Sequence, residues 1–466
     1  REVYIGTVDA SGQLFDAVRH AASRDGQTRF FVSSTDPWHR ATDLDANVEQ
    51  AGIDRVFSSG LTHGLPMLVP VGVLYDTPDN AAALLRYLQR RGYPVRGIEL
   101  GEEPDGQLVA PEDFGALYLQ AADALRAVDP GVTLGGPSLQ SLWEAPMMAW
   151  AGTSVAPDRP WLARFLSYLQ EHDRAADLGF LSFEWYPFDD VCAPVAPLLQ
   201  EAPALLAAAI AGLYEQGLPR STPLLMTEYG YSAFATQAEV DLAGALFNAD
   251  TIGTFLTQGG SAAYLYGYEP SAIDRDLHSP CETWGNNTLF LSDQHRRILA
   301  RTATYHGARL LARQWAGNPA QAHRIYPARV DVGAADGSSP LSAYALQRPD
   351  GLWAVLLVNK DPTREWTVVL RFAGLDPGAL ASLQGAADLY QFSAAQYQWR
   401  ANGEHGRPQR SEPPRHSRLR EGAPLQVPAW SLTVIRSSGP AGLTRSIGAG
   451  AVTAGSRMTS KELTWP

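Results

Sequence analysis

The chain has 466 residues, of which 45% are hydrophobic, and carries a net charge of −12. This length allows two domains, or one large barrel with a smaller second domain. A mean hydropathy of −0.17, with no run of about 18 apolar residues, argues against a membrane span, and the acidic charge argues against a nucleic-acid partner, because phosphate binding needs a basic surface.

Apolar, strand-like runs alternate with helix-like stretches over roughly the first 310 residues, the pattern of a β/α fold. Because the sequence begins at Arg1 without a methionine or a signal-like segment, we expect a processed chain or a fragment. The candidate strands are 3–8, 28–34, 66–75, 95–100, 132–138, 178–187, 223–232 and 261–270. Helices are expected between most of them, including near 11–24, near 45–59 and near 292–313.

Most of these runs are continuously apolar, which is typical of strands that are covered on both faces. Eight β/α units over about 310 residues predict a (β/α)8 TIM barrel. A doubly wound open sheet is the alternative. It usually has a glycine-rich phosphate turn after its first strand, and "VDASGQ" at 8–13 is not such a turn.

The pattern changes after residue 315, where strand-like runs follow one another without helices. These runs are "LSAYALQ" (341–347), "LWAVLLVNK" (352–360), "EWTVVLRF" (365–372) and "PLQVPAWSLTVIR" (424–436). They predict a small antiparallel β-sandwich. We therefore expect a catalytic barrel over 1–315, a β-sandwich over 316–437 with a long surface loop at 401–423, and a disordered tail over 438–466.

In TIM-barrel enzymes the active site lies at the C-terminal ends of the strands. In this sequence those ends carry many acids and aromatic residues, namely Asp36, Trp38, His39, Glu102, Glu103, Asp105, Glu184, Trp185, Tyr186, Glu228, Tyr229, Tyr266, Tyr268 and Glu269. Two carboxylates across a pocket can cleave a glycosidic bond, one as the acid and the other as nucleophile or base. Aromatic rings suit the apolar faces of sugars. The strand ends therefore predict a carbohydrate substrate, either an oligosaccharide or a polysaccharide.

Two stretches, "GIELGEEPDG" (97–106) and "PLLMTEYGYS" (223–232), resemble the catalytic fourth and seventh strand ends of the retaining glycoside hydrolases of clan A. The stretches "GGPS" (135–138) and "LGFLSFEWYPF" (178–188) are similar to that clan's fifth and sixth strands, and "VPAWSLTVI" (427–435) to its accessory sandwich. Glycoside hydrolase family 39 is the most similar family. The resemblance covers roughly residues 25–437 and rests on the order and spacing of strand ends.

The resemblance implies double displacement with retention, with Glu103 as acid/base and Glu228 as nucleophile, and no cofactor. The residue before the acid/base is usually an asparagine that contacts the sugar near its 2-hydroxyl, but here it is Glu102. Glu184 stands where a histidine is common. A carboxylate beside Glu103 would raise the pKa of at least one of the pair. Glu102 is either a substrate contact or one half of a structural ion pair.

Several other side chains are candidate sugar contacts. The "DPWH" loop offers Asp36, Trp38 and His39, and an aromatic residue in a loop is hard to explain as core. Neighbours in a strand point to opposite faces, so we expect Tyr186 rather than Trp185 to line the pocket. Tyr268 and Trp284 are further candidates. A tyrosine at a strand end is more often a core or rim residue, and a loop tryptophan can equally pack against its own loop.

The histidines and cysteines do not form a metal-binding motif, so no metal is expected. Cys192 and Cys281 form either one bridge or two free thiols. A non-catalytic carbohydrate-binding protein is the alternative function. A Schiff-base aldolase is excluded because Lys360 and Lys461, the only two lysines, lie outside the expected barrel. Polysaccharides are mostly extracellular, so we expect a secreted or periplasmic bacterial protein.

Overall fold

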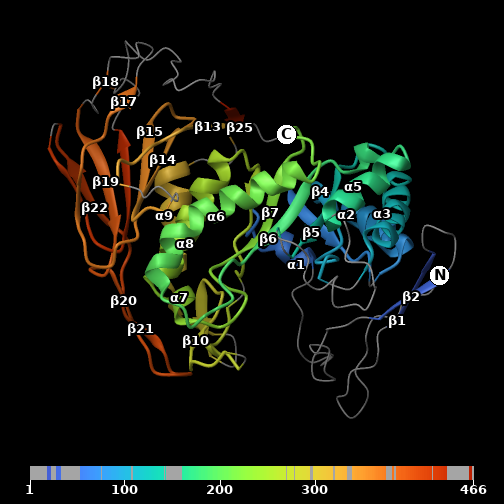
Figure 1. The fold of residues 1–466 in the computed structure, drawn as a ribbon, viewed down its shortest axis with the longest axis horizontal. Coiled ribbons are helices and arrows are strands. Elements are labelled where there is room, and N and C mark those ends of the chain that lie inside the picture. The colour runs from blue at the N-terminus through green and yellow to red at the C-terminus, as the bar shows by residue number, and fades with distance from the viewer. Residues whose placement is uncertain are drawn as a thin grey trace. The chain divides into compact units, whose positions relative to one another are not determined.

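The computed structural model divides into two compact units, each described here by itself (Figure 1). Unit 1 comprises Arg1–Trp185 and Ala209–Thr227, and unit 2 comprises Tyr186–Ala208 and Glu228–Pro466. The structure describes residues 18–22, 28–32, 53–74, 76–106, 109–140, 142, 160–268, 270–277, 279–293, 297–317, 321–332, 338–373, 380–381, 385–421, 423–437 and 461–463.

A parallel sheet of six strands carries the predicted strand ends. Its order is β3 (Met67–Val71), β4 (Val95–Leu100), β5 (Leu134–Leu139), β6 (Leu181–Trp185), β7 (Leu224–Tyr229) and β8 (Ala262–Ala263). Strands β3 to β6 pair in parallel, which brings their C-terminal ends to one edge. Every residue of β5 and β6 is buried, as their continuous apolar runs predicted.

The helices of unit 1 are α1 (Ile53–Ser58), α2 (Pro78–Arg91), α3 (Pro111–Arg126), α5 (Trp161–Glu171) and the 3₁₀ turn η2 (Ala175–Asp177). Helix α2 begins where Thr77 accepts a hydrogen bond from the Asn80 amide, and it ends at Gly92 with φ 65°. Helix α3 packs between α2 and α5. Its Phe114 ring lies 5.5 Å from that of Trp161 and 5.6 Å from that of Phe165 on α5.

Unit 2 holds α7 (Gln237–Val240), α8 (Leu242–Thr257), α9 (Ala303–Leu310) and the π-helix η3 (Leu311–Ala316). Helix α6 (Val195–Glu215) runs from unit 2 into unit 1 and contains Pro203. Its length and composition would allow it to cross a membrane, and 28% of its most apolar stretch is buried. One such helix is weak evidence, so the expected absence of a span stays a prediction.

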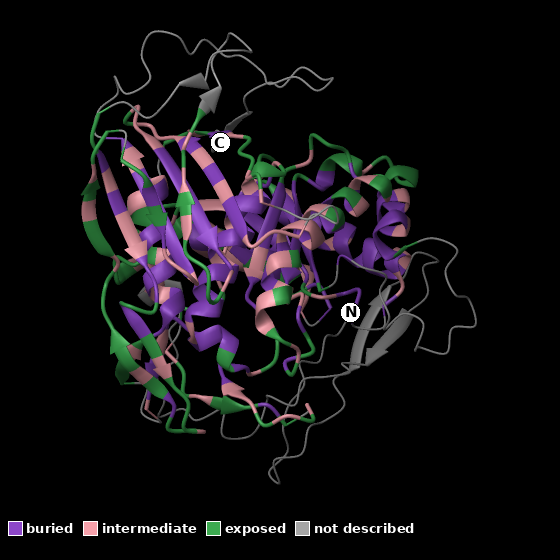
Figure 2. Cartoon of the chain, turned by 60° about the vertical axis from the view of Figure 1, so that its left-hand side comes forward, coloured by how far each residue is buried: buried purple, intermediate pink, exposed green. Residues whose placement is uncertain are grey.

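The C-terminal part of unit 2 is built on a seven-stranded antiparallel sheet. Its order is β22 (Arg415–Leu419), β19 (Ala387–Phe392), β24 (Ser431–Ser437), β15 (Trp353–Asn359), β14 (Leu341–Gln347), β13 (His323–Tyr326) and β25 (Lys461–Leu463). In Figure 2 the strands of this sheet are largely buried with intermediate positions between, and β15 is buried from Ala354 to Asn359. This confirms the C-terminal antiparallel sheet that the sequence predicted.

Both faces of that sheet are covered, which explains its continuous apolar strands. On one face, Val355, Leu357 and Ile435 form a core with Leu425 and Val427. The last two belong to the ribbon of β16 (Trp366–Val368) and β23 (Leu425–Val427), which acts as the second layer. On the other face, α8 packs against β14, β15 and β24.

The remaining two-stranded ribbons are β9 (Asp274–Arg275) with β10 (Trp284–Gly285), β11 (Phe290–Ser292) with β12 (Ile298–Arg301), β17 (Phe372–Ala373) with β18 (Leu380–Ala381), and β20 (Tyr397–Arg400) with β21 (Arg407–Ser411).

The N-terminal prediction needs correction. The helix expected near 11–24 is wrong over Val18–Ala22, which is strand β1 and pairs antiparallel with β2 (Thr28–Val32). The strand expected at 28–34 therefore exists, but as part of this hairpin rather than of the parallel sheet. Local propensity is weak, and a pairing partner can override it. The strand expected at 3–8 lies outside the described residues.

Four later predictions also differ. The eighth strand, expected at 261–270, is only Ala262–Ala263. The helix expected near 292–313 begins at Ala303, because Ile298–Arg301 pairs as a strand and Thr302 has an extended backbone with ψ 170°. The loop expected at 401–423 contains β21 and β22, whose polar side chains suit exposed sheet edges. The tail at 438–466 includes strand β25, and its other residues lie outside the described part.

Candidate active site

The end of β4 sets the position of Glu103. Gly101 has φ 90°, and a β-carbon there would lie 2.8 Å from the Phe114 ring, so the turn requires glycine. Glu103 itself has φ 48°, an uncommon conformation for a residue other than glycine. Its amide donates to the Ser138 carbonyl at 2.8 Å, which ties the turn to the end of β5. Glu102 is exposed and Glu103 is partly exposed.

Asp105 has a structural role. It is buried, and its Oδ1 accepts a hydrogen bond from the Gln140 amide at 2.9 Å. This bond joins the β4 turn to the segment that follows β5. Asp105 therefore holds the loop in place, as aspartates in turns commonly do.

Hydroxyl groups connect the ends of β5, β6 and β7 within unit 1. The Ser138 hydroxyl donates to Oε1 of Glu184 at 3.3 Å and lies 3.0 Å from the hydroxyl of Thr227. The Ser138 amide donates to the Ser182 hydroxyl at 2.9 Å. Glu184 is only 4% exposed. This carboxylate is therefore held deep at the strand ends by a polar network rather than at the protein surface.

Glu99 on β4 belongs to the same network, although the sequence patterns did not point to it. It is 7% exposed, and burial raises the pKa of its carboxyl to about 7, although hydrogen bonds with Ser182 and Thr227 act in the opposite direction. The nearby charge of Glu102 raises this pKa further. The only signal in the sequence was one glutamate inside the otherwise apolar stretch "GIEL".

Glu102 and Glu184 lie near each other in unit 1. Their closest carboxylate oxygens are within 4.8 Å, although the two residues come from different strand ends. Like charges at this distance repel, and a cation or a shared proton relieves the repulsion. Carboxylate oxygens are also the ligands that hard cations such as Ca²⁺ and Mg²⁺ prefer. Among the described residues of unit 1, these two carboxylates lie close enough together to share a positively charged group.

Glu228 lies in β7, and its surroundings in unit 2 are aromatic. The Tyr186 hydroxyl donates to Oε2 of Glu228 at 2.9 Å, which fixes the orientation of the carboxylate. A β-carbon at Gly230 would lie 2.9 Å from the Tyr186 ring, so glycine is needed beside this tyrosine. The rings of Tyr186 and Tyr266 are 6.4 Å apart and meet edge to face. Trp185 is buried, which agrees with the expectation that the two neighbours point to opposite faces.

The remaining predicted sugar contacts have fewer interactions in the structure, or lie outside the described residues. Tyr268 is 56% exposed and contacts Phe290 edge to face at 5.7 Å. Trp284 is partly exposed in a short ribbon, where Arg275 lies 5.8 Å above its ring. Its Nε1 donates to Glu282 at 3.3 Å, a contact that suits a loop-packing role. Asp36, Trp38 and His39 lie outside the described residues.

Cys192 and Cys281 form a disulfide, which decides between the two alternatives that the sequence left open. The bridge joins two residues of unit 2, in segments that follow β6 and β8, across a sequence separation of 89 residues. Closing so long a loop restricts the unfolded chain and stabilises the folded one by about 2–4 kcal/mol. The loops that follow these two strands are thus linked covalently.

Comparison with solved structures shows the fold. A family 51 arabinofuranosidase from Xanthomonas axonopodis pv. citri has a TM-score of 0.55 and 13% identity, covering 90% of this chain and 81% of that chain. An α-L-arabinofuranosidase from Thermotoga maritima, in complex with arabinose, has a TM-score of 0.53 and 15% identity, covering 83% and 78%. A family 44 endoglucanase from Clostridium thermocellum has a TM-score of 0.52 and 14% identity, covering 82% and 83%.

The chain therefore has the fold of TIM-barrel glycosidases, with a parallel sheet followed by an antiparallel one. No protein-family model matches the sequence, and no curated protein does either. At such low identity the likeness describes the scaffold alone. The chemistry has to be argued from the residues at the strand ends.

Proposed function

We propose that the protein is a glycoside hydrolase that works by double displacement with retention on a closed (β/α)8 barrel. The proposal is carried by acids at the ends of β4 and β7, on a scaffold shared with known glycosidases. Strand-end acids are the usual catalytic groups of this fold. Within the clan, family 39 is the membership that we propose from the sequence motifs.

In the proposed first step, Glu228 attacks the anomeric carbon while Glu103 gives its proton to the leaving oxygen. The glycosidic bond breaks and an ester bond to Glu228 forms. In the second step, Glu103 takes a proton from water, the water oxygen attacks the anomeric carbon, and Glu228 leaves. Tyr186 supports this assignment, because a hydrogen bond to one carboxylate oxygen orients the other for attack.

We also propose a carbohydrate substrate outside the cytoplasm, in a secreted or periplasmic setting. The Cys192–Cys281 bridge supports this location, because disulfides persist mainly in oxidising compartments. Tyr266 and Tyr268 offer exposed aromatic rings for the apolar faces of sugars. Asp36, Trp38, His39 and Trp284 stay proposed sugar contacts on sequence grounds.

Amide variants of the two acids test the proposal. We expect Glu103→Gln to lower kcat/KM on aryl glycosides with poor leaving groups by about 10²–10⁴-fold, the usual contribution of general acid catalysis. Glu228→Gln should abolish turnover, because no ester can form. Glu215→Gln, an exposed acid at the end of α6, is the matched control and should keep wild-type rates.

The outcomes separate the parts of the proposal. Near wild-type rates in both active-site variants would contradict the assignment of the two acids. Proton NMR of the first product reports its anomeric configuration, and inversion would reject double displacement while leaving a hydrolase. Tight binding of oligosaccharides with no product after long incubation would favour the alternative, a non-catalytic carbohydrate-binding protein.

A further inference from the structure

One stretch of unit 2 is strongly basic, although the chain as a whole carries a net charge of −12. Residues 400–420 contain six arginines and two acids, Glu404 and Glu412, and all six arginines are exposed. Exposed charges act mainly within the screening length, which is about 8 Å at physiological ionic strength. The positive charge of this stretch can therefore attract an anion, even though the rest of the chain is acidic.

The register of β20 and β21 brings three of these arginines to one face of their ribbon. Arg400 pairs directly with Arg407, and Gln398 pairs with Arg410. Paired residues of antiparallel strands lie on the same face, and so do residues two apart on one strand. Tyr397 alternates with them and is fully buried, so the arginines lie on the outward face. We call Arg400, Arg407 and Arg410 the arginine face.

The direct pairing of Arg400 with Arg407 favours a role in binding over a role in folding. Like charges directly opposite each other in a sheet are destabilising. Arg410 has Glu412 at 3.9 Å, but among the described residues no carboxylate oxygen lies within 4.0 Å of the other two side chains. Charge on exposed strands does discourage pairing with other chains. One arginine opposite a neutral residue would serve that purpose without repulsion, whereas a bound anion would relieve it.

The position of the ribbon and the chemistry of its side chains indicate the kind of anion. The turn between β20 and β21 lies against β10, because a β-carbon at Gly403 would be 3.6 Å from the Trp284 ring (Figure 1). Strand β10 belongs to the segment that follows β8, as do the exposed rings of Tyr266 and Tyr268. Guanidinium groups present a planar fork of N–H donors that pairs with two oxygens of an oxyanion. The ribbon thus offers paired oxyanion contacts beside the loops of the proposed active site.

We propose that the arginine face binds the acidic groups of an anionic polysaccharide. The choice of a polysaccharide rests on the proposed function, whereas the face itself is made of residues that take no part in the proposed chemistry. Carboxylate groups of acidic sugars and sulfate esters both present the oxyanion that Arg400 and Arg407 would share. A polymer is required rather than a single sugar, since the arginines of residues 400–420 extend from the ribbon onto the edge strand β22.

Binding to the full chain tests this inference. The Glu228→Gln variant, used to prevent turnover, is titrated calorimetrically with polygalacturonate, dextran sulfate and neutral dextran of similar length. We expect at least one of the two polyanions to bind at least tenfold more tightly than dextran, and less tightly when salt is raised. The ranking of the two polyanions shows whether carboxylate or sulfate is preferred.

Arginine variants locate the binding. Adding Arg400→Gln and Arg407→Gln should lower the affinity for the preferred polyanion at least tenfold. Adding Arg90→Gln and Arg313→Gln, which removes two exposed charges elsewhere, is the matched control and should change it by less than threefold. Because the first pair of changes removes a repulsion, the unfolding midpoint should stay the same or rise. A lower midpoint would give the two arginines a structural role and overturn the inference.

The other outcomes are equally decisive. Equal affinity for the polyanions and dextran, or an equal loss in the control variant, would overturn the inference. A short DNA duplex that binds the arginine face more tightly than either polysaccharide would make it a nucleic-acid site, which also overturns it. Polyanion binding that depends on Arg400 and Arg407, in a wild-type chain that cleaves no glycoside, would support the inference and reject the proposed function. Cleavage of neutral aryl glycosides without polyanion binding would do the reverse.

Discussion

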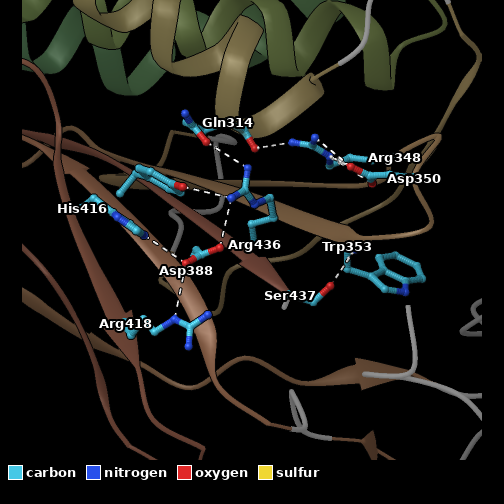
Figure 3. Close-up of polar contacts among 10 residues, drawn as sticks. Gln314, Arg348, Asp350, Trp353, Asp388, His416, Arg418, Arg436 and Ser437 are labelled. Carbon is cyan, nitrogen blue, oxygen red and sulfur yellow. Dashed lines mark hydrogen bonds and ion pairs between the residues drawn. The ribbon is translucent and has the colours of Figure 1, made fainter. Parts of the chain in front are cut away.

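Two regions of the molecule surround the carboxyl group of a strand residue with opposite kinds of partner. On β19 in unit 2, Asp388 accepts hydrogen bonds from Arg436 and His416, both at 3.0 Å, with Arg418 at 3.8 Å (Figure 3). On β4 in unit 1, Glu99 has hydroxyl groups as partners and a second glutamate, Glu102, nearby. Positive charge surrounds the first acid, whereas the described groups that act on the second are two hydroxyls and a carboxylate.

The consequences for the two pKa values have opposite signs. Burial raises the pKa of Asp388, but the hydrogen bonds from His416 and Arg436 outweigh it, so the net pKa lies below the usual value. Burial dominates at Glu99 and raises its pKa to about 7. Arg436 also bonds to Gln314 and Tyr390, so Asp388 belongs to a connected structural network. Cationic partners therefore outweigh the effect of burial at Asp388, whereas the hydroxyl partners of Glu99 do not outweigh it.

The largest effect should come from the most deeply buried partnered acid. Lys360 is fully buried, and its Nζ donates to Asp250 at 2.7 Å and to Ser342 at 2.9 Å. Lys360→Met leaves Asp250 buried without its cation, so we expect the free energy of unfolding to fall by about 3–5 kcal/mol. Urea unfolding followed by circular dichroism measures this.

Two further variants make the lysine test specific. The double variant Lys360→Met with Asp250→Asn removes both charges and should recover much of the lost stability. Arg410→Met removes an exposed cation and should change stability by less than about 0.5 kcal/mol. A loss below about 1 kcal/mol in the single variant would mean that the buried pair contributes little, against the structural role assigned to it.

The charge on Glu99 should make the folded chain less stable as the pH rises. Its folded pKa of about 7 exceeds the unfolded value of 4.5, so the folded chain holds the proton more tightly and stability falls as pH rises from 4.5 to 7. Glu99→Gln removes this loss. We expect it to stabilise the chain by about 3 kcal/mol at pH 8, since each unit of pKa corresponds to about 1.4 kcal/mol, and to have little effect at pH 4.

Unfolding midpoints at several pH values check this expectation. Glu215→Gln, an exposed acid, serves as the control and should change stability little at any pH. A Glu99→Gln variant that is destabilised equally at pH 4 and pH 8 would show that Glu99 is a structural acid, which would remove the contrast with Asp388.

The buried strands could be predicted from the sequence because their apolar runs are long and continuous. Strands β3 to β7 lie where runs such as 95–100 and 223–232 placed them, and so do the long central strands β14 and β15. Short or polar elements could not be predicted in this way. The β1 strand and the polar β22 owe their structure to a pairing partner, which local sequence does not reveal.

The residues of the candidate site also differ in how far the sequence reveals them. The positions of Glu103, Glu184 and Glu228 near strand ends were predictable, because the end of a buried strand is visible in the sequence. Glu99 was not, because its importance depends on Ser182 and Thr227, which come from two other strands. Proximity across strands follows from the register of the sheet, and a single sequence does not state that register.

The smallest effect is expected at Asp388 itself, which is close to the surface. Asp388→Asn keeps the shape of the side chain but removes the charge that Arg436 and His416 contact, so we expect the free energy of unfolding to fall by about 1 kcal/mol at pH 7.

This effect should depend on pH. Because the folded pKa of Asp388 lies below the unfolded one, the stabilisation by Asp388 is present above its unfolded pKa and is lost as pH falls through the folded pKa. The variant and the wild type should therefore differ at pH 7 and converge in strong acid, the opposite of Glu99→Gln. High salt should also shrink the difference at pH 7, because partly exposed ion pairs are screened. Equal destabilisation at all pH values would assign the effect to lost packing instead of charge.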